Sequence, residues 1–171
     1  MSRPLRLFAA PLLILALVAL AVPAAAEDAA APEPITAFSL PNLAGGNYDL
    51  SEHLGEKVIL INFWATWCTP CMKEMPKLNV MQKEHADKLQ VISISADEAR
   101  DQAKVKAIIK RFQYEPIVLL DAETKVVAKL NKRKDMPYTL IIGKDKMIHH
   151  RKKGFTDGDE EKLEEWVKAL F

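Results

Sequence analysis

The sequence predicts an α/β fold in which a central mixed sheet is flanked by helices, because apolar strand-like runs alternate along the chain with amphipathic helical patterns. Val58–Trp64 is almost entirely apolar, which is typical of a strand covered on both faces. Leu89–Ser95 and Ile117–Leu120 have a similar composition. These three runs are expected to form the centre of the sheet.

Amphipathic stripes predict the helices. Each stripe repeats apolar residues at intervals of three or four, so that they share one helical face. The first stripe consists of Leu78, Met81, His85 and Leu89, the second of Val105, Ile108, Ile109 and Phe112, and the last of Leu163, Trp166, Val167 and Leu170. The last stripe predicts a helix that closes the domain.

Two hairpins are predicted, one on each side of the central runs. Residues 38–40 and 48–50 alternate apolar and polar side chains across Gly45 and Gly46, and glycine tolerates the positive φ that tight turns require. Tyr138–Ile142 and residues 146–150 form the second pair of strand-like runs. The first hairpin is expected to precede the main sheet.

The first 26 residues are typical of a secretory signal peptide. Two arginines precede an apolar stretch at residues 12–22, and a run of alanines ends at Ala26, where we expect cleavage. An uncleaved membrane anchor is the alternative, but the apolar stretch is shorter than the roughly 20 residues of a spanning helix. Residues 27–34, rich in Ala and Pro, are expected to be a flexible linker, and residues 35–171 one domain.

Composition excludes several classes of function. The chain has 24 basic and 23 acidic residues, a balance without the excess positive charge that drives nucleic-acid binding. Its two cysteines are too few for a multi-bridge secreted scaffold or an all-cysteine zinc site. We therefore expect no nucleic-acid partner. We also expect no metal, no bound cofactor and a monomeric protein.

The two cysteines lie three residues apart, directly after a buried strand and before a helical pattern. The backbone N–H groups at a helix N-terminus favour negative charge, so the pKa of Cys68 should be lowered and its thiolate reactive. Cys71, one turn further, could then displace a bound substrate and close a Cys68–Cys71 disulfide. An inert structural disulfide is the alternative, but closing so short a loop restrains little chain entropy.

The chain resembles the TlpA/ResA-like thiol-disulfide oxidoreductases of the thioredoxin superfamily from about residue 35 to the C-terminus. The segments that carry the resemblance are Phe38-Ser39-Leu40-Pro41-Asn42-Leu43, Leu50-Ser51, Asn62-Phe63-Trp64-Ala65-Thr66-Trp67-Cys68-Thr69-Pro70-Cys71 and Glu74-Met75-Pro76. The resemblance implies a thioredoxin-like fold with an N-terminal β-hairpin and an inserted helical segment at residues 97–114. It also implies that Pro76 kinks the helix that carries the cysteines.

The resemblance also assigns roles around the dithiol. Met136-Pro137 is similar to the family's cis-proline site, which offers backbone hydrogen bonds to a bound substrate. Three residues beside the cysteines are expected to contact the substrate as well, namely Trp67, Thr69 and Pro70. Glu74 stands where reductases of this family often carry an acid, and on a helix it shares a face with Cys71, with which it could exchange protons. The alternative is a solvated glutamate that complements the helix dipole.

The sequence departs from related proteins at two places. Asn62 replaces the buried aspartate of thioredoxin and cannot ionise, so thioredoxin's own proton route is in doubt here. The segment before Met136 is strongly charged, Lys132-Arg133-Lys134-Asp135, where the family usually has small residues. This basic run is either a solvated turn or a surface that favours an acidic partner protein.

The predicted function is therefore an exported thiol-disulfide oxidoreductase located in the periplasm or otherwise outside the cytoplasm. The resemblance suggests a reductase of protein disulfides, such as the haem-binding cysteines of apocytochromes c in cytochrome c maturation, kept reduced by a membrane thiol-electron donor. Delivery of a soft metal such as copper is one alternative, with Met72 and Met75 near the cysteines. A thiol peroxidase is the other. The sequence leaves open the direction of electron flow and the reduction potential.

Overall fold

The computed structural model describes residues 31–171, which form an α/β domain. The elements in chain order are β1 (Glu33–Pro34), β2 (Ser39–Pro41), β3 (Asn47–Asp49), β4 (Val58–Trp64), α1 (Thr69–Glu84), β5 (Leu89–Ser95), α2 (Gln102–Phe112), β6 (Ile117–Leu120), α3 (Lys125–Leu130), β7 (Tyr138–Ile142), β8 (Met147–Lys153) and α4 (Asp159–Lys168). Short 3₁₀ helices at Leu50–Glu52 and Ala99–Asp101 complete the order. The predicted signal peptide and residues 27–30 of the predicted linker lie outside the described residues.

A mixed sheet forms the centre of the domain, as predicted. Its strand order is β1-β8-β7-β4-β5-β6. β4, β5 and β6 are parallel to one another, whereas β7 and β8 run antiparallel to their neighbours. β2 and β3 pair separately as the predicted hairpin, and both glycines of its turn have positive φ, 116° at Gly45 and 72° at Gly46.

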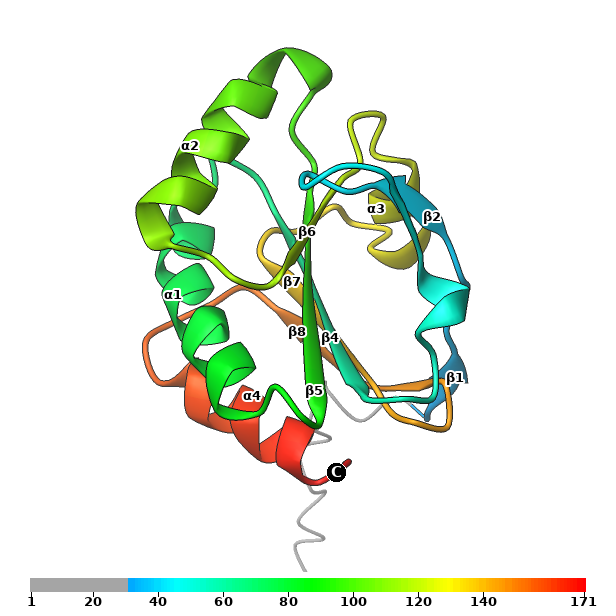
Figure 1. Ribbon diagram of the computed structural model, residues 1–171. Coiled ribbons are helices and arrows are strands. Elements are labelled where there is room, and N and C mark those ends of the chain that lie inside the picture. Colours follow the sequence, from blue (N-terminus) through cyan, green and yellow to red (C-terminus); the bar gives the residue numbers. More distant parts are fainter. Residues whose placement is uncertain (1–30) are drawn as a thin grey trace, which may run out of the picture.

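Each face of the sheet carries its own layer of secondary structure. α1, α2 and α4 cover one face, while α3 and the β2–β3 hairpin cover the other (Figure 1). Alternate residues of β4 divide between the two cores: Leu60 and Trp64 pack toward α1, and Ile61 and Phe63 pack toward the hairpin. Burial on both faces explains why the β4 run is apolar throughout.

The structure corrects two predicted boundaries and adds a helix. Glu33 and Pro34, expected in the linker, pair with β8. α1 ends at Glu84 with His85 as its C-cap, so Leu89 belongs to β5 and not to the helical stripe. α3 was not predicted at all.

The segment predicted to be inserted, residues 97–114, contains α2 and the 3₁₀ helix before it. Within residues 31–171, no helix combines the length and apolar character that crossing a membrane requires.

Candidate active site

Cys68 and Cys71 stand where β4 passes into α1. Cys68 is the N-cap of α1, and its Sγ accepts a hydrogen bond from the Cys71 backbone N–H at 3.3 Å. A disulfide joins the two residues, with an S–S distance of 1.99 Å and a Cα–Cα distance of 5.3 Å. Cys68 is 4% exposed and Cys71 is 0% exposed. Of the two sulfurs, that of Cys68 is therefore the one that a substrate can approach first.

The turn that leads into Cys68 is fixed by Asp97, a residue that the sequence did not single out. Asp97 follows β5, is 4% exposed, and accepts hydrogen bonds from the Thr66 backbone N–H at 2.9 Å and the Thr66 hydroxyl at 2.6 Å. Ser95 donates a further bond to the same carboxylate at 2.8 Å. The Cys68 N–H in turn donates to the Ala65 carbonyl at 3.0 Å. The parallel pairing of β4 with β5 thus holds the first cysteine in position.

The predicted substrate-contacting residues beside the cysteines form an exposed rim. Thr69 and Pro70 are exposed on the first turn of α1, and Trp67 is 70% exposed. Leaving a tryptophan in solvent is costly for an apolar ring, and such residues are characteristic of contact surfaces. The rim therefore offers an apolar surface next to the reactive sulfur.

The segment with Met136 and Pro137 lies beside this rim. The register of β4 with β7 pairs Phe63 with Tyr138, which brings the residues before Tyr138 next to the end of β4 where the cysteine turn begins. The Met136–Pro137 peptide bond is cis, as the resemblance implied. Met136 packs against the core cluster that contains both cysteines. The segment with Met136 and Pro137 and the cysteine turn thus lie at the same end of the central strands.

Glu74 lies on α1, three residues after Cys71, and is 0% exposed. Its Oε2 accepts a hydrogen bond from Asn62 Nδ2 at 2.7 Å, and its Oε1 accepts one from the Thr139 hydroxyl at 3.1 Å. The sheet register pairs Asn62 with Thr139 on neighbouring strands, so the two donors lie side by side on the face of the sheet that α1 covers. The alternative of a solvated glutamate at the helix start is therefore wrong.

The surroundings of Glu74 raise its pKa toward neutral pH. Burial raises the pKa of Glu74 to about 7, against the opposing effects of the hydrogen bonds from Thr139 and Asn62 and of the Lys152 charge. Lys152 lies opposite Thr139 on β8 and forms an ion pair with Asp159 at 2.6 Å. A carboxyl with such a pKa is present in both protonation states near pH 7, as proton exchange requires.

Asn62 has a different role from the ionisable residue that it replaces. It donates through Nδ2 to Glu74 and to the Thr139 hydroxyl at 3.3 Å. Asn62 therefore orients the Glu74 carboxylate, and Glu74 is the ionisable residue among Asn62, Glu74 and Thr139. Thr139 was not singled out from the sequence, because its role depends on which strand lies beside β4.

The methionines near the cysteines have other partners. Met75 is fully buried in the core cluster beneath α1. The Met72 sulfur accepts a long hydrogen bond from Arg111 at 3.9 Å. These positions give no specific support to a copper site built from the cysteines and a methionine.

Comparison with known proteins agrees with this geometry. The Redoxin family model matches residues 29–167. The chain is 31% identical over 134 residues to the thiol-disulfide oxidoreductase ResA of Bacillus thuringiensis subsp. konkukian (strain 97-27), a match that covers 78% of this chain and 74% of ResA. It is 41% identical over 85 residues to the thioredoxin-like protein YneN of Bacillus subtilis (strain 168), a match that spans only 49% of either chain.

Solved structures lead to the same group of proteins. A protein of Chlorobium tepidum, provisionally assigned as thiol:disulfide interchange protein DsbE, superimposes with a TM-score of 0.73 at 26% identity, over 81% of this chain and 96% of that one. StoA of Bacillus subtilis shares the fold with a TM-score of 0.62 at 21% identity, over 77% of this chain and 96% of that one. The chain therefore belongs to the Redoxin family and is a thiol-disulfide oxidoreductase of the ResA and DsbE type.

Proposed function

We propose that this oxidoreductase acts as a reductase of protein disulfides outside the cytoplasm. The observation that carries the proposal is the arrangement of three groups at the start of α1. Cys68 is slightly exposed, Cys71 is fully buried, and Glu74 lies one helical turn beyond Cys71 with a pKa raised to about 7. In this arrangement Cys68 is the attacking thiol, Cys71 is the resolving thiol and Glu74 is the proton acceptor.

In the forward reaction the Cys68 thiolate attacks a substrate disulfide, and a mixed disulfide forms as the first substrate thiolate leaves. Cys71 then gives its proton to the Glu74 carboxylate, and its thiolate attacks the Cys68 sulfur. The second substrate thiolate leaves as the Cys68–Cys71 disulfide closes. The substrate is reduced by two electrons as the Cys68–Cys71 pair is oxidised. One substrate thiolate takes up the proton that Glu74 received from Cys71, and the other takes up a solvent proton equivalent to the one that Cys68 released when its thiolate formed.

Two features of the site favour this order of events. Backbone N–H groups at the α1 N-terminus stabilise the Cys68 thiolate. Cys71, by contrast, sits in an apolar cluster, where a thiolate is disfavoured unless a base is close. Glu74 is the base that α1 supplies. The apolar surroundings thus favour the Cys71 thiol, and Glu74 takes its proton when Cys71 attacks the mixed disulfide.

Return to the dithiol requires an electron donor. Since the leader is typical of exported proteins, the donor would be a membrane thiol carrier on the outer side of the membrane. The substrate class suggested by the TlpA/ResA-like resemblance is the haem-binding cysteine pair of apocytochromes c. This assignment would make the protein a factor in cytochrome c maturation.

The test is to trap the proposed intermediate. The Cys71→Ser variant should accumulate a mixed disulfide between Cys68 and a disulfide-containing peptide, visible as an added mass that dithiothreitol removes. Cys68→Ser serves as the matched control and should trap nothing. Trapping on Cys71 in the control, or on neither cysteine in either variant, would contradict the proposed roles.

A further inference from the structure

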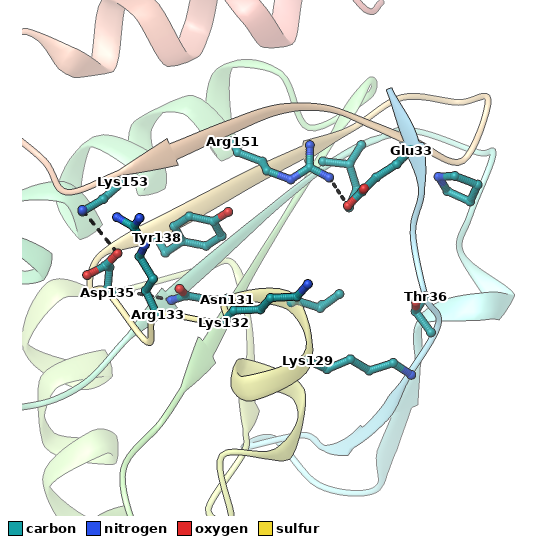
Figure 2. Close-up of a pocket in the computed structure, with 13 residues that line it drawn as sticks. Glu33, Thr36, Lys129, Asn131, Lys132, Arg133, Asp135, Tyr138, Arg151 and Lys153 are labelled. Carbon is teal, nitrogen blue, oxygen red and sulfur yellow. Dashed lines mark hydrogen bonds and ion pairs between the residues drawn. The ribbon is translucent and has the colours of Figure 1, made fainter. Parts of the chain in front are cut away.

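A basic cavity lies on the α3 face of the sheet, at the edge formed by β8 and β1. Its volume is about 450 Å³, within the range of typical ligand sites. Figure 2 shows side chains from β1, α3, the segment after α3, β7 and β8 gathered around it. Five of the lining residues are basic and two are acidic, a net charge of +3: Lys129, Lys132, Arg133, Arg151 and Lys153 against Glu33 and Asp135.

The positive charge of this cavity is only partly neutralised. Arg151 forms an ion pair with Glu33, and Lys153 forms one with Asp135 at 3.5 Å (Figure 2). The remaining cations are exposed and make no ion pair or side-chain hydrogen bond within residues 31–171, namely Lys129, Lys132 and Arg133. Since the whole chain carries a net charge of only +1, this is a local concentration of charge and not a property of the whole surface.

A second cavity of about 550 Å³ adjoins the first and shares four lining residues with it. It adds Lys152 and Lys162, with Asp159 as its acidic member. Together the two cavities, which we call the basic groove, are lined by seven basic and three acidic residues. Two adjoining cavities with residues of β8 in both linings suit an extended chain better than a single small anion.

The basic groove also follows an open strand edge. β1 pairs with β8 only at Met147 and Ile148, so residues 149–153 of β8 have no strand partner on that side within the described part of the chain. Extended segments bind such edges through backbone hydrogen bonds, with alternate side chains placed in flanking pockets. Charged residues on an edge also discourage aggregation, but that purpose does not require cavities or the cations outside the strand.

The basic groove is joined to the active site through the chain. Asp135, which lines the cavity, directly precedes Met136, which packs against the cluster that contains the cysteines. The backbone N–H of Gly154, just after β8, donates to the carbonyl of Pro137 at 2.8 Å. A polypeptide bound at Pro137 would therefore have the groove directly beside it.

We propose that the basic groove binds an acidic, extended segment of the protein substrate near the cysteines that are reduced. The inference rests on the proposed reductase function and adds a substrate preference to it. Within the basic run, Lys132 and Arg133 line the groove, whereas Lys134 does not.

The test compares two peptides with the same disulfide. One carries short runs of glutamate on both sides of the cysteine pair, and the other carries glutamine at those positions. Reduction of each peptide by the reduced protein is followed by tryptophan fluorescence. At low ionic strength we expect the second-order rate constant for reduction of the glutamate peptide to exceed that for the glutamine peptide at least fivefold, and the preference to fall as salt screens the charges.

The double variant Lys129→Gln/Lys132→Gln should lose most of this preference and should reduce the glutamine peptide as wild type does. The matched control Lys106→Gln/Lys110→Gln removes the same charge from exposed positions of α2 and should retain the preference. Equal reduction of both peptides by wild type would overturn the proposal that the groove binds acidic segments, and so would an equal loss of preference in both double variants. Either result would leave the reductase function intact. Reduction of neither peptide would count against the reductase function, and the groove proposal would fail with it.

Discussion

Replacing Glu74 by glutamine is expected to change how the stability of the oxidised protein depends on pH. The pKa of Glu74 is raised from 4.5 to about 7 by burial. Well below pH 4.5 the carboxyl is protonated in both the folded and the unfolded state and contributes no pH dependence. As the pH rises, the unfolded state loses its proton first, so the free energy of unfolding falls until the pH passes about 7.

The size of this loss follows from the pKa shift. Each unit is equivalent to about 1.4 kcal/mol, so the shift is worth about 3 kcal/mol above pH 8. Glutamine has the same shape but does not ionise. Its side-chain oxygen can accept from Asn62, and its amide can donate to the Thr139 hydroxyl, which replaces the observed contacts. Glu74→Gln should therefore match wild type near pH 4 and exceed its stability by about 3 kcal/mol at pH 8.

The assay is urea unfolding of the oxidised proteins between about pH 4 and pH 9, followed by circular dichroism. Glu52→Gln provides a matched control, because Glu52 is exposed, and its difference from wild type should vary little across the range. A difference between Glu74→Gln and wild type that stays constant with pH would refute the reasoning, since it would show that Glu74 ionises alike in the folded and unfolded states.

Three further substitutions test the surroundings of the disulfide. Asp97→Ala leaves the Thr66 N–H and hydroxyl without their acceptor and should lower the free energy of unfolding by about 3 kcal/mol in urea titrations, whereas a loss below about 0.5 kcal/mol would contradict the role of Asp97. Thr139→Val removes a hydrogen bond to the Glu74 carboxylate and should raise the pKa of Glu74 further, as read from its carboxyl carbon by NMR; an unchanged pKa would exclude this contribution. Trp67→Ala should leave stability unchanged, because the ring is 70% exposed, while kcat/KM for a disulfide peptide falls about tenfold. Unchanged kinetics would remove Trp67 from the substrate surface.

The elements that could be predicted from the sequence are those whose patterns are set by burial alone. Val58–Trp64 is apolar throughout because both of its faces are covered, and the hairpin strands alternate because only one face is. α3 was missed because it has only six residues, Lys125–Leu130, too few to show a helical period. Its start depends on Asp121, whose carboxylate accepts from the Lys125 and Val127 N–H groups.

The chemistry of the site was predictable only in part for a similar reason. The position of the two cysteines after a buried strand is a local feature, and so the helix N-cap at Cys68 could be expected. The burial of Glu74 depends on Asn62 and Thr139 being cross-strand neighbours beneath α1, which requires the strand order. Asp97 reaches Thr66 across 31 residues, and nothing in its own segment indicates that contact.

The reduction potential of the Cys68–Cys71 disulfide tests the central claim most directly. The protein is equilibrated with mixtures of reduced and oxidised dithiothreitol or glutathione, and the fraction of dithiol is read from tryptophan fluorescence. A reductase that depends on a dedicated electron donor predicts a potential below about −230 mV. A potential above about −180 mV would make the protein an oxidant or isomerase and would contradict the account.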